Sequence, residues 1–207
     1  MKFIQKGQEP PELAAWKALS NDNWKPTCDA LRGEEKAALL EALLREQGSI
    51  CCYCERRLTE GDRHIEHLVP QCDGSVDGLD FTNMLCSCQD RLCPGEPRHC
   101  GNLKGDWHDP DLLVSPLDSG CEARFAFLGN GEIRPADDGD EGAKTTIRRL
   151  GLGIPKLNSM RMGAIEPFLD AALTEADLLN FVERYLLPDP NGDYSPFHTT
   201  IQSLFDG

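Results

Sequence analysis

The chain has 207 residues, enough to bury a hydrophobic core in one domain or two small ones. It has no apolar run of membrane-spanning length, and its first residues are followed at once by polar ones. We therefore expect a soluble, cytoplasmic protein with neither a membrane span nor a secretory signal. Ten cysteines in such a protein indicate metal binding rather than disulfides.

The formal net charge of −14 bears on nucleic-acid binding, because phosphate contacts need a basic footprint. Residues 106–207 hold 8 Lys and Arg against 18 Asp and Glu, a balance of −10, which leaves −4 for residues 1–105. The acidity therefore belongs mainly to the C-terminal half. A protein of this charge is expected to bind duplex DNA poorly by itself.

Residues 1–50 are predicted to be helical. A first helix should run over Glu12 to Leu19 after two prolines, since proline lacks the N–H that a first turn leaves unpaired. A second should begin after Gly33 with an acidic first turn, carry leucines at helical spacing and end at Gly48. We interpret this second helix as amphipathic, with its leucines facing the core.

Residues 51–105 have little periodicity and much Gly, Cys and Asp. Such a segment cannot assemble a large apolar core, so a metal that staples it together is physically reasonable. We expect a strand from Arg63 to Val69 and a loop from Gln71 to Phe81.

The cysteines of this segment have a spacing that suits zinc. Zinc prefers four tetrahedral ligands, and Cys51 and Cys54 can occupy two corners from one tight turn. Cys52, next to them, should point away from the metal. Spacing alone leaves the second pair open among Cys86, Cys88, Cys93 and Cys100. Three distant cysteines are predicted to be ordinary buried thiols, namely Cys28, Cys72 and Cys121.

The centre of the segment is the run from His64 to His67, which suits phosphodiester hydrolysis. That reaction needs an activated water, a cation on the scissile phosphate and stabilisation of the leaving oxygen. His67 would take the proton from water, since an unperturbed imidazole has a pKa of about 6.5. Glu66 would hold the catalytic divalent cation, Mg²⁺ or Mn²⁺. His64 shares a strand face with Glu66 and is predicted to contact nucleic acid.

Taken in order, these features resemble an HNH endonuclease of the zinc-stapled ββα-metal type. The ordered set is Cys-x-x-Cys, Glu-His-x-x-Pro, Asn83, a late cysteine and Lys104-Gly105. The resemblance implies Cys88 and Cys100 as the second zinc pair, with Cys86 and Cys93 as alternatives. It also implies that Asn83 is the family's central Asn, which holds the loop and orients the base. We predict a nucleic-acid contact for Lys104.

The chain departs from the family at one position. The family has a metal-binding His or Asn directly after the last zinc cysteine, where this chain has Gly101. We predict that Asn102, one residue further on, replaces it as a ligand of the catalytic cation.

Residues 106–207 are predicted to form a second unit of helices with a small β-hairpin. The hairpin should pair Arg124–Leu128 with Glu132–Pro135 across Gly-Asn-Gly. Helices are expected at about 143–150 and 156–173, from the N-cap Thr174 onward, and over Phe197 to Phe205.

Several short segments along the chain are similar to PtuB-type HNH proteins of Septu and retron-associated anti-phage systems. The segments are Met1–Pro10, Ser115–Asp118, Cys121–Phe127, Gly131–Ile133 and Thr146–Leu152. The resemblance implies an effector that works in a complex with an ABC-type ATPase (PtuA). We hypothesise that residues 106–207 dock this partner.

The predicted fold class is therefore α+β and mostly helical. It comprises an N-terminal helical segment (1–50), a zinc-stapled HNH core (51–105) and a C-terminal helical unit with a hairpin (106–207). The predicted function is metal-dependent cleavage of DNA. RNA such as tRNA stays open as the substrate, and two other functions stay open: a free-standing nuclease, and a zinc-stapled binding module with a vestigial motif.

Overall fold

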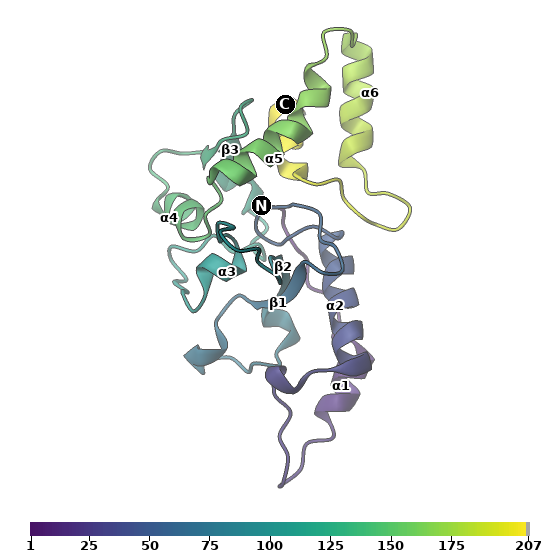
Figure 1. Ribbon diagram of the computed structural model, residues 1–207, viewed down its shortest axis with the longest axis vertical. Coiled ribbons are helices and arrows are strands. Elements are labelled where there is room, and N and C mark those ends of the chain that lie inside the picture. The colour runs from purple at the N-terminus through teal and green to yellow at the C-terminus, as the bar shows by residue number, and fades with distance from the viewer. Residues whose placement is uncertain (206–207) are drawn as a thin grey trace.

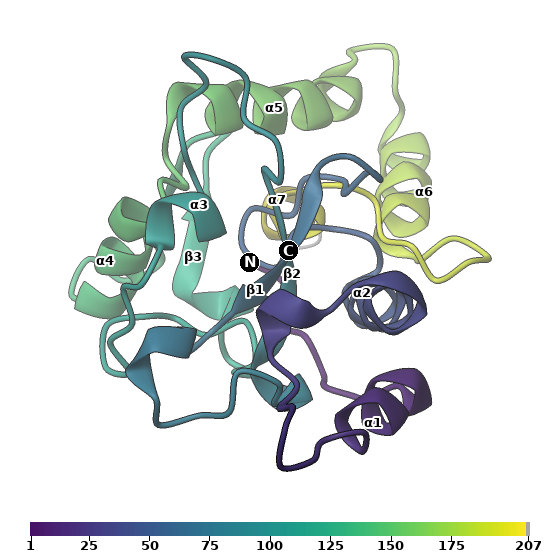
Figure 2. The same ribbon diagram turned by 60° about the horizontal axis from the view of Figure 1, so that its bottom comes forward.

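The computed structural model describes residues 1–205 of the chain (Figure 1). A central β-hairpin lies between helix α2 on one side and helices α3 and α4 on the other (Figures 1 and 2). In chain order the helices and strands are α1 (Pro11–Lys17), α2 (Gly33–Gln47), β1 (Arg63–His67), β2 (Met84–Cys88), α3 (Gly101–Lys104), β3 (Phe125–Phe127), β4 (Ile133–Pro135), α4 (Glu141–Arg149), α5 (Pro155–Ile165), α6 (Glu175–Leu186) and α7 (His198–Phe205).

Helix α2 confirms the amphipathic helix that the sequence predicts. Its leucines Leu39 and Leu43 are fully buried, and Gly48 ends it in the left-handed conformation at φ 58°. At its last turn Gln47 is buried, and its amide donates to the Cys86 carbonyl (2.8 Å) and accepts from the Cys86 N–H (2.7 Å). The Gln47 side chain therefore pairs with both backbone groups of Cys86, as a neighbouring strand would, and holds the central hairpin on α2.

The central hairpin pairs β1 with β2 in antiparallel register, with Arg63 opposite Cys88 and His67 opposite Met84. The first strand confirms the predicted one and stops two residues earlier, at His67. Periodicity gave no signal for β2, because all five of its residues are buried and the strand therefore lacks polar alternation. Its place as the second β of a ββα unit was implied only by the family resemblance.

The C-terminal half contains the predicted hairpin, in which Phe127 of β3 lies opposite Ile133 of β4. The Thr174 hydroxyl caps α6 as predicted, accepting from the Asp177 N–H at 3.2 Å. The long helix predicted over 156–173 is wrong. Helix α5 ends at Ile165, and a 3₁₀ turn over Glu166–Leu169 follows. Pro167 in that turn explains the break, since proline lacks the N–H that would continue the helix and restricts the residue before it.

One buried apolar cluster draws on all three predicted segments, from Leu39 through Met84 to Leu150 and Leu157. The chain is also joined across residue 105 by the Cys100 N–H, which donates to the Leu150 carbonyl at 2.8 Å. The three-domain division stays a prediction, and packing crosses both of its boundaries.

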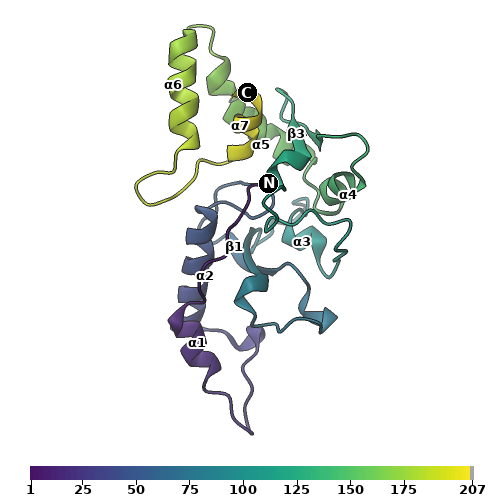
Figure 3. The same cartoon turned by 180° about the vertical axis from the view of Figure 1, so that it is seen from behind.

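A second, smaller cluster lies under α6, where Phe168 stacks on Phe181 with ring centroids 4.3 Å apart. Helix α6 protrudes beside α7 at the end of the molecule away from α1 (Figure 3). Within residues 1–205, no helix is both long enough and apolar enough to cross a membrane.

Candidate metal and catalytic centre

Four cysteine thiols meet in the interior beside the central hairpin. Cys51 and Cys54 come from the turn after α2, Cys88 from the end of β2, and Cys100 from the residue before α3. All four sulfurs lie within 4.8 Å of one another, and all four residues are buried. The Cys54 and Cys88 sulfurs are 3.8 Å apart. This matches the edge of about 3.8 Å that four thiolates form about 2.3 Å from a zinc ion.

This donor set is the one that the sequence and the family resemblance select, and its chemistry fits a structural zinc ion. Cys86 is buried but lies outside the group, and Cys93 is exposed, so neither alternative is needed. The sequence missed His99, which is fully buried with Nδ1 3.1 Å from the Cys100 sulfur. A ring N–H directed at a thiolate stabilises its charge. One prediction about ordinary thiols is wrong: Cys72 is exposed, in the short turn after Pro70.

Glu66 lies buried at the inner end of β1, and two side chains hold one of its oxygens. Oε1 is 2.9 Å from the Lys104 ammonium and accepts from the Tyr53 hydroxyl at 3.0 Å. Burial alone would raise the pKa of this carboxyl, but His64 and Lys104 beside it lower the pKa below its ordinary value. Glu66 is therefore a carboxylate in a fixed orientation, as a metal ligand requires.

The predicted nucleic-acid contact of Lys104 is wrong. Its side chain is 1% exposed, and the ammonium donates to the His67 carbonyl at 2.8 Å as well as pairing with Glu66. An ammonium so enclosed does not reach a phosphate backbone. Lys104 instead joins helix α3 to the two residues that end β1.

The His67 ring is oriented by a backbone group. Its Nε2 lies 2.9 Å from the Gly78 carbonyl oxygen. Because a carbonyl oxygen only accepts, Nε2 carries the hydrogen and Nδ1 is the nitrogen free to take a proton. The expectation that Asn83 sets this tautomer is corrected: Gly78, in the loop after β1, does so.

Asn83 has the other role predicted for it, which is to hold the loop. Its Oδ1 accepts from the Val69 N–H at 2.8 Å, and its Nδ2 donates to the Val69 carbonyl at 2.9 Å. Both backbone groups of Val69 are thus clamped two residues after His67. The clamp fixes the direction in which the chain leaves β1.

The structure does not bring Asn102 to Glu66. Its amide donates to the Gln89 carbonyl, and no hydrogen bond or ion pair described for residues 1–205 joins it to the carboxylate. The reason is helical geometry, since one residue along a helix turns a side chain by about 100°. Gly101 faces Glu66, and Asn102 points elsewhere.

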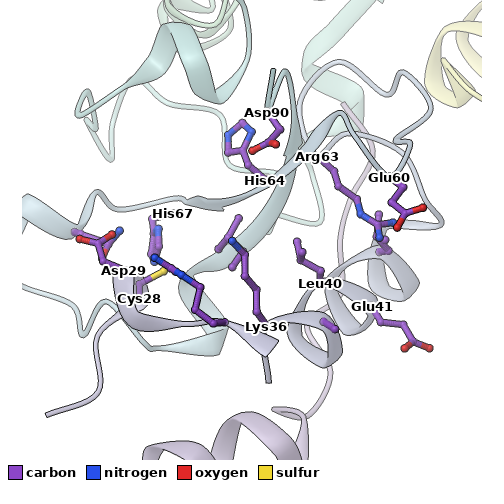
Figure 4. Close-up of a pocket in the computed structure, with 15 residues that line it drawn as sticks. Cys28, Asp29, Lys36, Leu40, Glu41, Glu60, Arg63, His64, His67 and Asp90 are labelled. Atoms are coloured by element: carbon purple, nitrogen blue, oxygen red, sulfur yellow. The ribbon is translucent and has the colours of Figure 1, made fainter. Parts of the chain in front are cut away.

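A cavity of about 940 Å³ opens between α2 and β1, and both His64 and His67 line it. Figure 4 shows Lys36 extending from α2 toward the strand that carries these histidines. The lining has three cationic side chains, Arg32, Lys36 and Arg63, and four carboxylates, Asp29, Glu41, Glu60 and Asp90. Its charge is mixed rather than basic.

The hairpin, the one-turn helix after it and the buried four-cysteine cluster together define an α+β fold consistent with a zinc-stapled ββα-metal core. No model of a known protein family matches the chain. The chain is 30% identical over 128 residues to a Vibrio cholerae serotype O1 biovar El Tor protein named "Retron Vc95 putative HNH endonuclease". That match covers 58% of this chain and 60% of the relative, so the chain spans about three fifths of the relative's length.

Proposed function

We propose that the protein is a metal-dependent HNH endonuclease that cleaves DNA as the effector of a PtuB-type, retron-associated anti-phage system. The observation that carries the proposal is the pair at the end of β1. There the Nε2 of His67 is hydrogen-bonded to the Gly78 carbonyl, which leaves Nδ1 free. The adjacent Glu66 is a buried carboxylate that Lys104 holds in a fixed orientation. The name of the distant relative supports the same chemistry.

In the proposed reaction, His67 Nδ1 takes a proton from a water molecule. The oxygen of that water bonds to the phosphorus while the bond from the phosphorus to the leaving oxygen breaks. A divalent cation held at Glu66 would neutralise charge on the phosphate and on the leaving oxygen. Lys104 and Tyr53 keep the carboxylate in place, while Asn83 keeps the end of β1 in place. None of these three touches the reacting atoms, so each is a positioning residue.

The direct test is to incubate the purified protein with duplex DNA and with total RNA, in Mg²⁺ or Mn²⁺. The assay is run with and without a co-expressed ABC-type ATPase. Cleavage of DNA supports the proposal, and cleavage of RNA alone identifies the RNA nuclease instead. If no condition gives turnover while both nucleic acids bind, the protein is a binding module with a vestigial motif.

The cavity beside His67 is the proposed path of the substrate backbone, and Lys36 is the residue to test. Lys36→Ala should weaken nucleic-acid binding. It should also reduce the slope of log K against log salt concentration by about 1, the contribution of one phosphate contact. Affinity measured between low and moderate salt checks this. Lys144→Ala is the matched control, because Lys144 is also exposed but lies on α4 outside the cavity. Equal losses in the two variants would assign the effect to overall charge.

We also propose that an ABC-type ATPase recruits this acidic chain to its substrate, since a net charge of −14 opposes phosphate binding. The proposed docking surface is the protruding α6, where Leu179 is 59% exposed and Leu187, just after the helix, is 58% exposed. Deleting residues 106–207 is not a clean test, because Leu150 and Leu157 belong to the main core.

Replacing both leucines by Asp (L179D/L187D) should reduce co-purification with the ATPase at least about tenfold, because a charged group buried at an interface is costly. Pull-down from cells that express both proteins measures the effect. Leu19→Asp is the control, since Leu19 is equally exposed at 62% but lies after α1. Full co-purification of L179D/L187D would place the partner on another surface.

A further inference from the structure

We infer that His64 is a ligand of the catalytic cation: it completes the cation site with Glu66, in the space that Gly101 leaves open. The inference deepens the proposed nuclease function and rests on it for the role of the cation. It replaces Asn102 as predicted ligand, and it changes the role of His64 from contacting substrate to binding metal.

The two oxygens of Glu66 have different surroundings. Oε1 is already engaged by Lys104 and Tyr53, at 2.9 and 3.0 Å. Oε2 is the oxygen that faces His64, with Nε2 of that ring 3.7 Å away. The carboxylate is thus held from one side and presents its other oxygen to an imidazole nitrogen.

The separation of Glu66 Oε2 and His64 Nε2 suits a shared cation. At 3.7 Å it is too long for a hydrogen bond. Two ligands about 2.1 Å from one divalent cation stand about 3.0 to 3.6 Å apart for ligand–metal–ligand angles of 90° to 120°, and the observed 3.7 Å is close to the upper value. The pair is therefore spaced as ligands of one cation, and an imidazole with a carboxylate is a common donor set for Mn²⁺ and other first-row metals.

Gly101 lies directly against these two donor atoms. A Cβ built at Gly101 would lie 2.3 Å from Glu66 Oε2 and 2.9 Å from His64 Nε2. This is the position at which the resembling family has its His or Asn ligand. In this chain a side chain there would collide with the donor atoms, whereas glycine leaves the space to the His64 ring coming from β1. Helix α3 therefore supplies no ligand at position 101, and His64 on β1 supplies one in its place.

The His64 ring is accessible from the cavity. The His64 side chain is 23% exposed and lines the same cavity as His67, so a cation beside its Nε2 is open to the substrate path. Its Nδ1 is buried and has no hydrogen-bond partner among the residues described. Among the residues that the structure describes, the polar neighbour of this ring is the Glu66 carboxylate, so no other protein group competes for it.

The test is Mn²⁺ binding to the zinc-loaded full-length protein, followed by electron paramagnetic resonance of free and bound Mn²⁺. We expect one Mn²⁺ site in the wild-type protein, with affinity lowered about 10- to 100-fold in His64→Ala and unchanged in Asn102→Ala. Zinc content and far-ultraviolet circular dichroism verify that each variant is folded. Bound Mn²⁺ should also show ¹⁴N modulation from a directly bound imidazole, which His64→Ala removes.

Wild-type affinity in His64→Ala, a loss confined to Asn102→Ala, absence of Mn²⁺ binding in the wild type, or ¹⁴N modulation that persists without His64 would each overturn the inference. If His64→Ala fails to fold, His64→Gln replaces it, and absence of ¹⁴N modulation in the wild-type protein overturns the inference by itself. Cleavage assays run in parallel separate the two proposals. A His64-dependent Mn²⁺ site without cleavage of any nucleic acid refutes the nuclease function and leaves the site. Cleavage together with a Mn²⁺ site that does not depend on His64 supports the nuclease function and refutes the assignment of His64 as a ligand.

Discussion

Replacing Cys51 by Ser should abolish the folded, soluble protein. Wild-type protein should contain about one tightly bound zinc per chain, because four buried thiols converge at zinc spacing. Structural zinc contributes roughly 10–16 kcal/mol of folding free energy in small zinc domains, as much as the whole stability of an ordinary domain. A hydroxyl in place of one thiolate loses a large part of that. The soluble yield and far-ultraviolet circular dichroism of the variant measure the effect, and elemental analysis measures the zinc content of the wild-type protein.

Cys93→Ser is the control for this prediction, because Cys93 is exposed and lies outside the group of four. It should keep both the zinc and the wild-type melting temperature. Cys54→Ser, on the same turn as Cys51, should behave like Cys51→Ser. Well-folded wild-type protein without zinc would remove the basis for the prediction.

The parts of this molecule that the sequence predicts are those with a local chemical signature. Helix α2 is predicted from its acidic first turn, its leucines at helical spacing and Gly48 at its end. The first zinc pair follows from a spacing of three residues along one turn. The choice of Cys88 and Cys100 needed the family resemblance, because spacing does not reveal which cysteines the fold brings to Cys51.

The site residues that the sequence placed wrongly depend on the tertiary structure. The Gly78 carbonyl orients His67, and a backbone carbonyl has no residue type to recognise. Lys104 has the composition of a phosphate contact, yet its one-turn helix turns the side chain inward onto Glu66. Asn102 has the chemistry of a metal ligand, but the direction of its side chain is set by the rotation of about 100° per residue along a helix. His99 gave no signal, since a lone His beside a cysteine is uninformative until its burial is known.

Replacing His67 by Ala should stop cleavage while leaving the protein folded. Proton transfer by a positioned base typically contributes about 100- to 10,000-fold in rate, and His67 Nδ1 is the nitrogen of that ring left free when Nε2 pairs with the Gly78 carbonyl. The fold should survive, since Lys104 binds the His67 backbone carbonyl rather than its ring. Single-turnover cleavage at saturating Mg²⁺ measures the chemical step, and zinc content reports on the fold.

His198→Ala is the matched control. His198 is also buried, at 5% exposed, and its ring nitrogen likewise pairs with a backbone carbonyl, that of Leu186 at 3.0 Å. Removing it should lower stability by about 1 kcal/mol, the typical worth of one such hydrogen bond, and leave the cleavage rate unchanged. Both variants lose one hydrogen bond to a backbone carbonyl, so both should show the same small destabilisation. Only His67→Ala loses the proton acceptor, so only that variant should cleave more slowly. Wild-type cleavage by His67→Ala would assign the proton acceptor to another group.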